Sequence, residues 1–150
     1  MTMVLVGCFM ALFSVCSLRT LAAQDLSSFM ERAENLVGSK VPGWKLTEKE
    51  LNEKEAKYQW GHARQGIRML IYYATSNEDA AEKLRLSIIR VSVGPDVKLK
   101  NLGDEAYLWI GPHSGSGVVQ FRKSNMYIHL VGTSSKLVED LARSLADLIP

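Results

Sequence analysis

Apolar side chains recur every three or four residues in three segments of the chain, the spacing that lines one side of a helix. The first segment covers residues 25–37 and is expected to end at Gly38. The second begins after Ser76, whose hydroxyl is suited to cap a helix, and the third follows a hydroxyl residue at 133–135. Each helix therefore carries one apolar stripe that must pack on another element.

Alternating apolar and polar residues predict strands between these helices. Residues 55–74 form a hairpin that turns between Gly61 and Gly66, and a short strand is expected near residues 44–46. Three further strands follow the second helix: Ala106–Ile110, Gly117–Lys123 and Met126–Val131. The pattern predicts an α+β fold in the order α-(β)-ββ-α-βββ-α, with a single antiparallel sheet of about five strands and helices packed on it.

The first 23 residues are typical of a secretory signal peptide. No charged side chain occurs from Met1 to Leu18, and small residues that suit cleavage after Ala22 or Ala23 follow. We therefore expect a signal peptide over residues 1–23 and a single secreted or periplasmic domain over residues 24–150. The apolar run is shorter than the ~20 residues that span a bilayer, so the mature form should have no membrane span.

Two other interpretations of this segment stay open. Arg19 could mark an uncleaved anchor, which would place the domain in the cytoplasm. Leu5-Val6-Gly7-Cys8 resembles a lipoprotein signal box, and a lipid anchor follows only if the true start lies upstream.

Composition narrows the classes of partner. Both cysteines, Cys8 and Cys16, lie in the predicted signal, so the mature chain should hold no disulfide and no thiol nucleophile. Losing Arg19 as well reduces 18 basic residues to 17, against 16 acidic ones, which leaves a formal charge of +1. This balance argues against nucleic acid as a partner, and the net charge gives no reason to adhere to anionic lipid.

The Gly/Ser-rich loop Gly111–Gly117 is the sharpest local feature. It contains no Gly-x-Ser-x-Gly frame and no Gly-Lys-Ser/Thr, and a strand follows it, so we interpret it as a hairpin connection. The alternative is a serine hydrolase that uses one of the loop serines with a histidine as base. That hypothesis would draw on the following residues: Ser114, Ser116, His62 and His113.

Other titratable residues do not form a recognisable site. The histidines show no metal-ligand spacing, and we expect no catalytic residue, metal site or cofactor. His129 should lie on a half-polar sheet face. Asp104 and Glu105 are neighbours before a strand and are expected to point to opposite sides of the chain, as in a turn that enters a strand.

Aromatic residues are the best candidates for binding. A ring-x-ring pattern occurs in three predicted strands, which place aromatic side chains at every second position. Side by side on one face, they would line an apolar groove for a small ligand or a peptide. We name four candidate ligand-binding residues: Trp60, Tyr107, Trp109 and Tyr127. The alternative is that the last helix covers them.

Two stretches carry a resemblance to a known group of domains. Residues 102–107 read Leu-Gly-Asp-Glu-Ala-Tyr, and residues 118–132 read Val-Val-Gln-Phe-Arg-Lys-Ser-Asn-Met-Tyr-Ile-His-Leu-Val-Gly. The chain resembles small exported bacterial domains of unknown function, similar to extracytoplasmic modules of the Mog1/PsbP-like kind, although Ser124 stands where a glycine is usual. The resemblance implies an α/β sandwich and carries no established catalytic residue to transfer.

These observations predict an exported, non-catalytic binding module that takes a small apolar ligand or a peptide on an aromatic sheet face. The alternatives are a subunit or accessory protein of an envelope complex, and the serine hydrolase described above. The partner is therefore expected to be a small molecule or an envelope protein.

Overall fold

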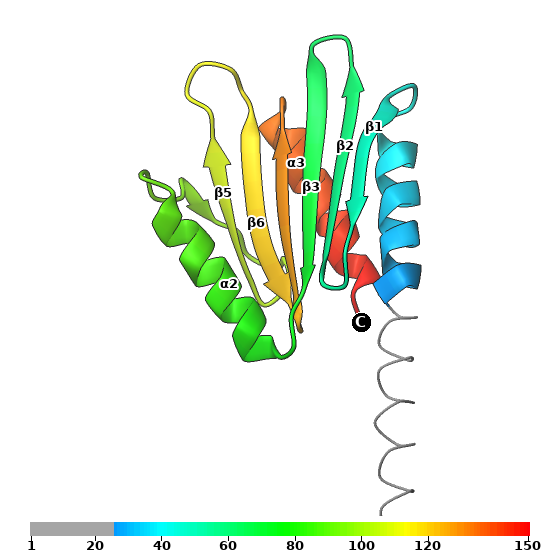
Figure 1. Ribbon diagram of the computed structural model, residues 1–150. Helices are drawn as coiled ribbons and strands as arrows, with labels where there is room; N and C mark the ends of the chain where they lie inside the picture. The colour runs from blue at the N-terminus through cyan, green and yellow to red at the C-terminus, as the bar shows by residue number, and fades with distance from the viewer. Residues whose placement is uncertain (1–25) are drawn as a thin grey trace, which may run out of the picture.

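Seven strands form one antiparallel sheet in the order β1-β2-β3-β7-β6-β5-β4 (Figure 1). The structure is a computed structural model that describes residues 26–150, so the predicted signal peptide with Cys8 and Cys16 lies outside the described residues. The strands are β1 (Lys45–Leu51), β2 (Glu55–His62), β3 (Gln65–Tyr73), β4 (Val97–Lys98), β5 (Glu105–Ile110), β6 (Gly117–Lys123) and β7 (Met126–Gly132). The α+β class and the single antiparallel sheet are confirmed.

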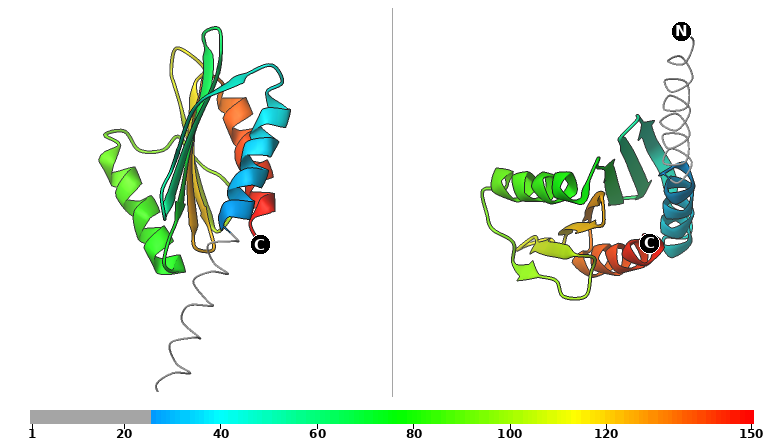
Figure 2. Two further views of the ribbon diagram at one scale, coloured as in Figure 1. Left: turned by 45° about the vertical axis from the view of Figure 1, so that its right-hand side comes forward. Right: turned by 90° about the horizontal axis from the view of Figure 1, so that it is seen from below.

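Three helices pack on this sheet in the order α-βββ-α-ββββ-α. Residues 26–40 are helical, and α2 (Asn77–Arg90) and α3 (Ser135–Leu148) follow. Figure 2 shows the first helix and α3 on one face of the sheet and α2 on the other. Within residues 26–150, no helix has the length and hydropathy needed to cross a bilayer.

Both cap predictions hold. The Ser76 hydroxyl accepts a hydrogen bond from the Asp79 amide at 3.1 Å. Among the three candidates at 133–135, Ser134 is the cap, and its hydroxyl accepts from the Leu137 amide at 3.3 Å. Each side chain satisfies one of the amides that a helix N-terminus leaves without a partner, which sets the first residue of α2 and of α3.

Three predicted details are wrong. The sheet has seven strands instead of about five, and the two-residue β4 was not predicted at all. β1 runs from Lys45 to Leu51, which is longer than the short strand expected near Trp44. All seven side chains of β1 are exposed, so the strand lacks the alternation that reveals a half-buried strand. Gly38 does not end the first helix, which continues to Lys40 and stops before Pro42.

The core lies between the sheet and the helical pair formed by residues 26–40 and α3. Strand alternation sends one side chain of each successive pair into it. Its largest fully buried members include Ile67, Met69, Phe121, Ile128 and Leu130. The helices approach the sheet closely, since a Cβ at Gly117 would lie 2.5 Å from the Cα of Ser135.

Gly103 is required at the turn before β5. Its φ is +59°, a region that side-chain-bearing residues avoid, and an added Cβ would lie 2.3 Å from the carbonyl oxygen of Arg122. Both the backbone strain and the contact with a paired strand oppose a side chain here.

Gly103→Ala should therefore lower the free energy of unfolding by at least about 2 kcal/mol. Gly94→Ala is the matched control, because nothing lies within 4 Å of a Cβ there. Its effect should stay within about 0.5 kcal/mol. Urea denaturation of both variants measures the difference, and equal stability of the two would show that the turn relaxes.

Candidate binding surface

The strand register separates the four aromatic candidates onto two faces. Trp60 pairs with Ile67, which pairs with Gly132, and this row faces the core. Tyr107 pairs with Gln120, which pairs with His129 on the opposite face. Trp109 and Tyr127 share the face of Tyr107, by the two-residue alternation along β5 and β7. The prediction that the four rings share one face is therefore wrong for Trp60.

Trp60 is a core residue. Its side chain is only 3% exposed, and its ring stacks on that of Tyr58 with the centroids 5.5 Å apart and the planes at 17°. Aromatic pairs in this arrangement stabilise a core beyond the area that they bury. The ring-x-ring pattern of β2 thus reflects packing against the helical pair.

The other three rings lie under α2 and the segment that follows it. Tyr127 is 2% exposed, and burial raises the pKa of its phenol above the ordinary value, although a hydrogen bond with Ser87 of α2 opposes the shift. The Trp109 indole is 9% exposed and donates to the Val93 carbonyl at 3.0 Å. Tyr107 is partly exposed, and its hydroxyl donates to Glu105 at 2.7 Å. α2 thus covers Tyr127 and the segment after it contacts Trp109, whereas the last helix, which the alternative named, lies on the other face of the sheet.

Part of the same sheet face has no helix over it. α2 packs mainly on β6 and β7, and the face of β2 and β3 beyond it is open (Figure 2). A hollow of about 370 Å³ lies there, and we call it the open-face hollow. Its lining residues are Glu48, Lys57, Tyr58, Gln59, Arg68, Met69, Leu70, His129 and Val131.

The register explains how these side chains meet. Lys57, Leu70 and His129 form one cross-strand row through β2, β3 and β7, and Gln59, Arg68 and Val131 form the next. Residues directly opposite in adjacent strands have neighbouring side chains. The hollow therefore has an aliphatic floor bordered by two cationic side chains and an imidazole.

Charges around the hollow are unevenly paired. Lys57 bonds Glu50 at 3.1 Å across β1 and β2. The ammonium of Lys83 in α2 pairs with Glu55 at 3.3 Å and lies 4.4 Å from the centroid of the Tyr72 ring. Lys83 thereby covers the row of Glu55 and Tyr72, which lies beside the hollow. Within residues 26–150, no ion pair includes Arg68. Its exposed guanidinium is thus available to an anion.

His129 is uncharged near neutral pH. Burial lowers the pKa of its imidazole below the ordinary value of 6.5, and the positive charge of Arg68 lowers it further. The side chain lies on the half-polar face that its sequence position predicted, between Leu70 and the buried Gln120. A neutral imidazole can both donate and accept one hydrogen bond at the floor of the hollow.

The Gly/Ser loop joins β5 to β6, as predicted. The hydroxyls of Ser114 and Ser116 lie 2.7 Å apart and bond each other, and the Gly111 amide donates to the Ser116 carbonyl at 2.8 Å. Neither hydroxyl bonds a histidine in the part of the chain that the structure describes. The same residues contain no cluster of three or more potential metal ligands.

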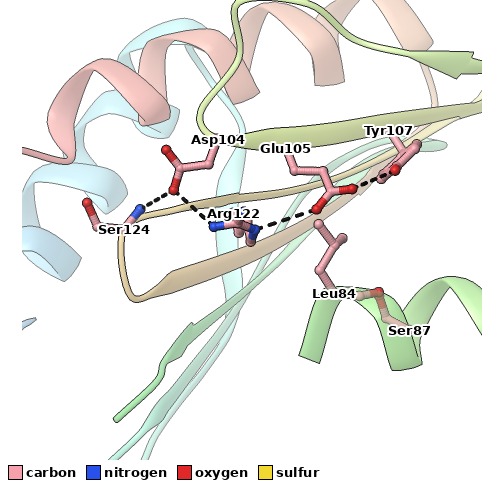
Figure 3. A network of polar contacts seen from close by, with 7 residues as sticks. All are labelled: Leu84, Ser87, Asp104, Glu105, Tyr107, Arg122 and Ser124. Atoms are coloured by element: carbon pink, nitrogen blue, oxygen red, sulfur yellow. Dashed lines mark hydrogen bonds and ion pairs between the residues drawn. The ribbon is translucent and has the colours of Figure 1, made fainter. Parts of the chain in front are cut away.

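A polar network centres on Arg122 (Figure 3). Its guanidinium contacts Asp104 at 3.1 Å and Glu105 at 3.6 Å. The two carboxylates were expected to point to opposite sides, but both reach this one cation. Asp104 also accepts from the Ser124 amide at 2.8 Å, and Ser124 has a φ of +53°, the region that glycine favours.

These contacts give a structural role to the two stretches that carry the resemblance, residues 102–107 and 118–132. They tie the turn before β5 to the turn between β6 and β7, and the Arg122 Nε is buried without a hydrogen-bond partner. Because both carboxylates contact one guanidinium, we assign the network to holding the start of β5 against the end of β6.

Sequence reasoning missed the residues of the open-face hollow. Arg68, Leu70 and Gln59 carry no motif, and their meeting depends on the pairing of β2 with β3 and of β3 with β7. The one available signal was His129 in an otherwise apolar strand. No family model matches this chain, and a search of curated proteins found no significant match.

Trp60→Ala should lower the free energy of unfolding by about 3–5 kcal/mol, because it removes a ring from the core. Leu51→Ala is the control, since Leu51 is large, apolar and 52% exposed, and should change stability by less than about 0.5 kcal/mol. Chemical denaturation compares the two. A stable Trp60→Ala protein would place the ring outside the core.

Stability should fall as the pH drops through about 6.5. The pKa of His129 is lower in the folded state than in the unfolded chain, so the unfolded chain binds more protons in the window between the two values. The full contribution of His129 to stability is present above that window, is lost progressively as the pH falls through it, and is absent below it. His129→Gln should flatten this part of the pH profile of urea denaturation, and the same exchange at the exposed His62 is the control.

Proposed function

We propose that this chain is an exported, non-catalytic binding module that holds a small, partly apolar anion in the open-face hollow. The observation that carries the proposal is the uncovered floor of Leu70, His129 and Val131 beside the Arg68 guanidinium, which has no ion-pair partner within residues 26–150. A hollow of this size is within the range of small-molecule sites.

The side chains favour an acid group attached to an apolar body. A guanidinium can bind a carboxylate or a phosphate through two parallel hydrogen bonds. Leu70 and Val131 offer apolar contact one strand apart, and the neutral His129 adds a hydrogen-bonding group. Long-chain carboxylates and acidic peptides with an apolar neighbour fit this description.

Two other observations support the proposal. The pairing of the Ser114 and Ser116 hydroxyls with each other favours a structural loop over a nucleophile. The apolar segment at residues 1–23 supports export, which is the part of the proposal that rests on the sequence alone. The resemblance of residues 102–132 to exported domains without catalytic residues agrees with both.

Arg68→Glu and Leu70→Asp should each weaken binding of an anionic apolar probe by about tenfold or more. The first reverses the charge that pairs with the acid, and the second places a carboxylate on the apolar floor. Fluorescence titration with anilinonaphthalene sulfonate measures the affinity. Both side chains are at least partly exposed, so the melting temperature should change little.

The matched control is Lys45→Glu, which reverses an exposed charge on β1 outside the hollow. Native mass spectrometry of the protein purified from its own envelope or medium then identifies the natural ligand. A small-molecule adduct that is retained by Lys45→Glu and lost by Arg68→Glu supports the hollow. Equal probe affinity in all three variants would contradict it.

A further inference from the structure

Apolar side chains are exposed along the second half of α2 and the segment after it. Ile89 is 63% exposed and Val93 is 71% exposed. Leu86 and Ile89 lie three residues apart on one helix face, opposite the face that Leu84 buries against the sheet, and Val93 follows in the segment after the helix. We define the 86–97 patch by its five exposed members: Leu86, Ile89, Val91, Val93 and Val97.

This exposure belongs to a fixed part of the fold. The Val91 amide donates to the Ile88 carbonyl at 3.1 Å and ends the helix. The Trp109 indole holds the Val93 carbonyl at 3.0 Å, and the Asp96 carboxylate accepts from the Ile110 amide at 2.6 Å. The segment is thus anchored to β5 at two points, with its apolar side chains still in solvent.

Basic residues are concentrated in the same stretch of the sequence, and Arg90 and Lys98 lie beside the patch. Residues 83–100 contain five basic side chains and one acidic one, a net charge of +4, whereas the whole chain carries +2. The rest of the chain is therefore net acidic. Within the described residues, none of Arg90, Lys98 and Lys100 forms an ion pair. All three side chains are exposed.

Acidic residues limit this surface to one half of the helix. Glu78 and Glu82 are exposed in the first half of α2, and Glu82 binds Arg85 at 2.6 Å. The apolar and cationic side chains begin after that pair. Figure 1 shows that this half of α2 runs away from the end of the sheet at which the C-terminus lies.

We propose that the 86–97 patch docks the protein on the surface of an anionic lipid bilayer. Exposed aliphatic side chains enter the boundary between headgroups and acyl chains, and flanking cations contact acidic headgroups. A second copy of the chain fits less well, because a two-fold contact would bring the cations Arg90 and Lys98 of one copy close to those of the other. This surface is separate from the open-face hollow and does not depend on its ligand.

The test is co-sedimentation with vesicles of phosphatidylcholine alone or with about one third phosphatidylglycerol. The protein and its variants are purified in the same processed form, so that any N-terminal contribution is common to all. Wild type should bind the anionic vesicles, bind neutral ones far more weakly, and dissociate as salt is raised.

Two variants address the two halves of the surface. Ile89→Ser with Val93→Ser should lower the partition coefficient on anionic vesicles by about tenfold, since it removes the apolar contact. Arg90→Gln with Lys98→Gln should lower it by a similar factor, about tenfold, on anionic vesicles only. Thermal melting of each variant verifies that the fold is retained.

The controls make the same exchanges elsewhere. Leu46→Ser with Leu51→Ser removes two exposed leucines of β1, and Lys40→Gln with Lys45→Gln removes two exposed charges. Partition that falls equally in the control pairs, or in none of the variants, overturns the proposal. Concentration-dependent self-association in sedimentation velocity that Ile89→Ser with Val93→Ser abolishes, without vesicle binding, would also overturn it and assign the patch to a second copy.

Discussion

The pairing of β3 with β7 is the interaction on which the rest of the structure depends. It joins two antiparallel meanders, β1-β2-β3 and β7-β6-β5-β4, through a row of core contacts in which Met69 lies opposite Leu130 and Ile71 opposite Ile128. The chain leaves this seam at the end of β3 and next enters the sheet at β4, on its far edge. α2 must therefore cross over β7 and β6, and it covers that half of its face. The other half stays open because no connection passes over it.

The same topology decides what each aromatic pair does. Alternation shows which residues of one strand share a face of the sheet. Only the register shows which residues of two neighbouring strands lie on the same face. Trp60 and Tyr127 have the same local pattern, yet the β2–β3–β7 register sends Trp60 to the core and Tyr127 under α2. No local signal in the sequence contains that register, which is why one aromatic face was predicted where the molecule has two separate packing layers.

Local features were predictable where a few neighbouring residues determine them. Ser76 and Ser134 cap helices through contacts three residues away, and the strong stripe of α3 identifies its buried side. Most of β1 and all of β4 were missed. β1 is exposed along its length and β4 has only two residues, so both depend on the partner strand. Gly38 was misjudged because its backbone is not left-handed, so the helix runs on through it to Lys40 and stops before Pro42.

Net charge is a poor guide to the surfaces of this molecule. The near balance of basic and acidic residues argued against a lipid partner. That balance is the sum of a basic segment at residues 83–100 and a net acidic rest of the chain. Long-range forces depend on the local density of unpaired charge within a Debye length, about 8–10 Å in physiological salt, so the distribution matters more than the sum. The pairing of β4 with β5 places Lys98 opposite Tyr107, close to the segment after α2 that the Trp109 indole holds. A basic apolar surface thus arises from topology, in the same way as the open-face hollow, and both are consequences of where α2 crosses the sheet.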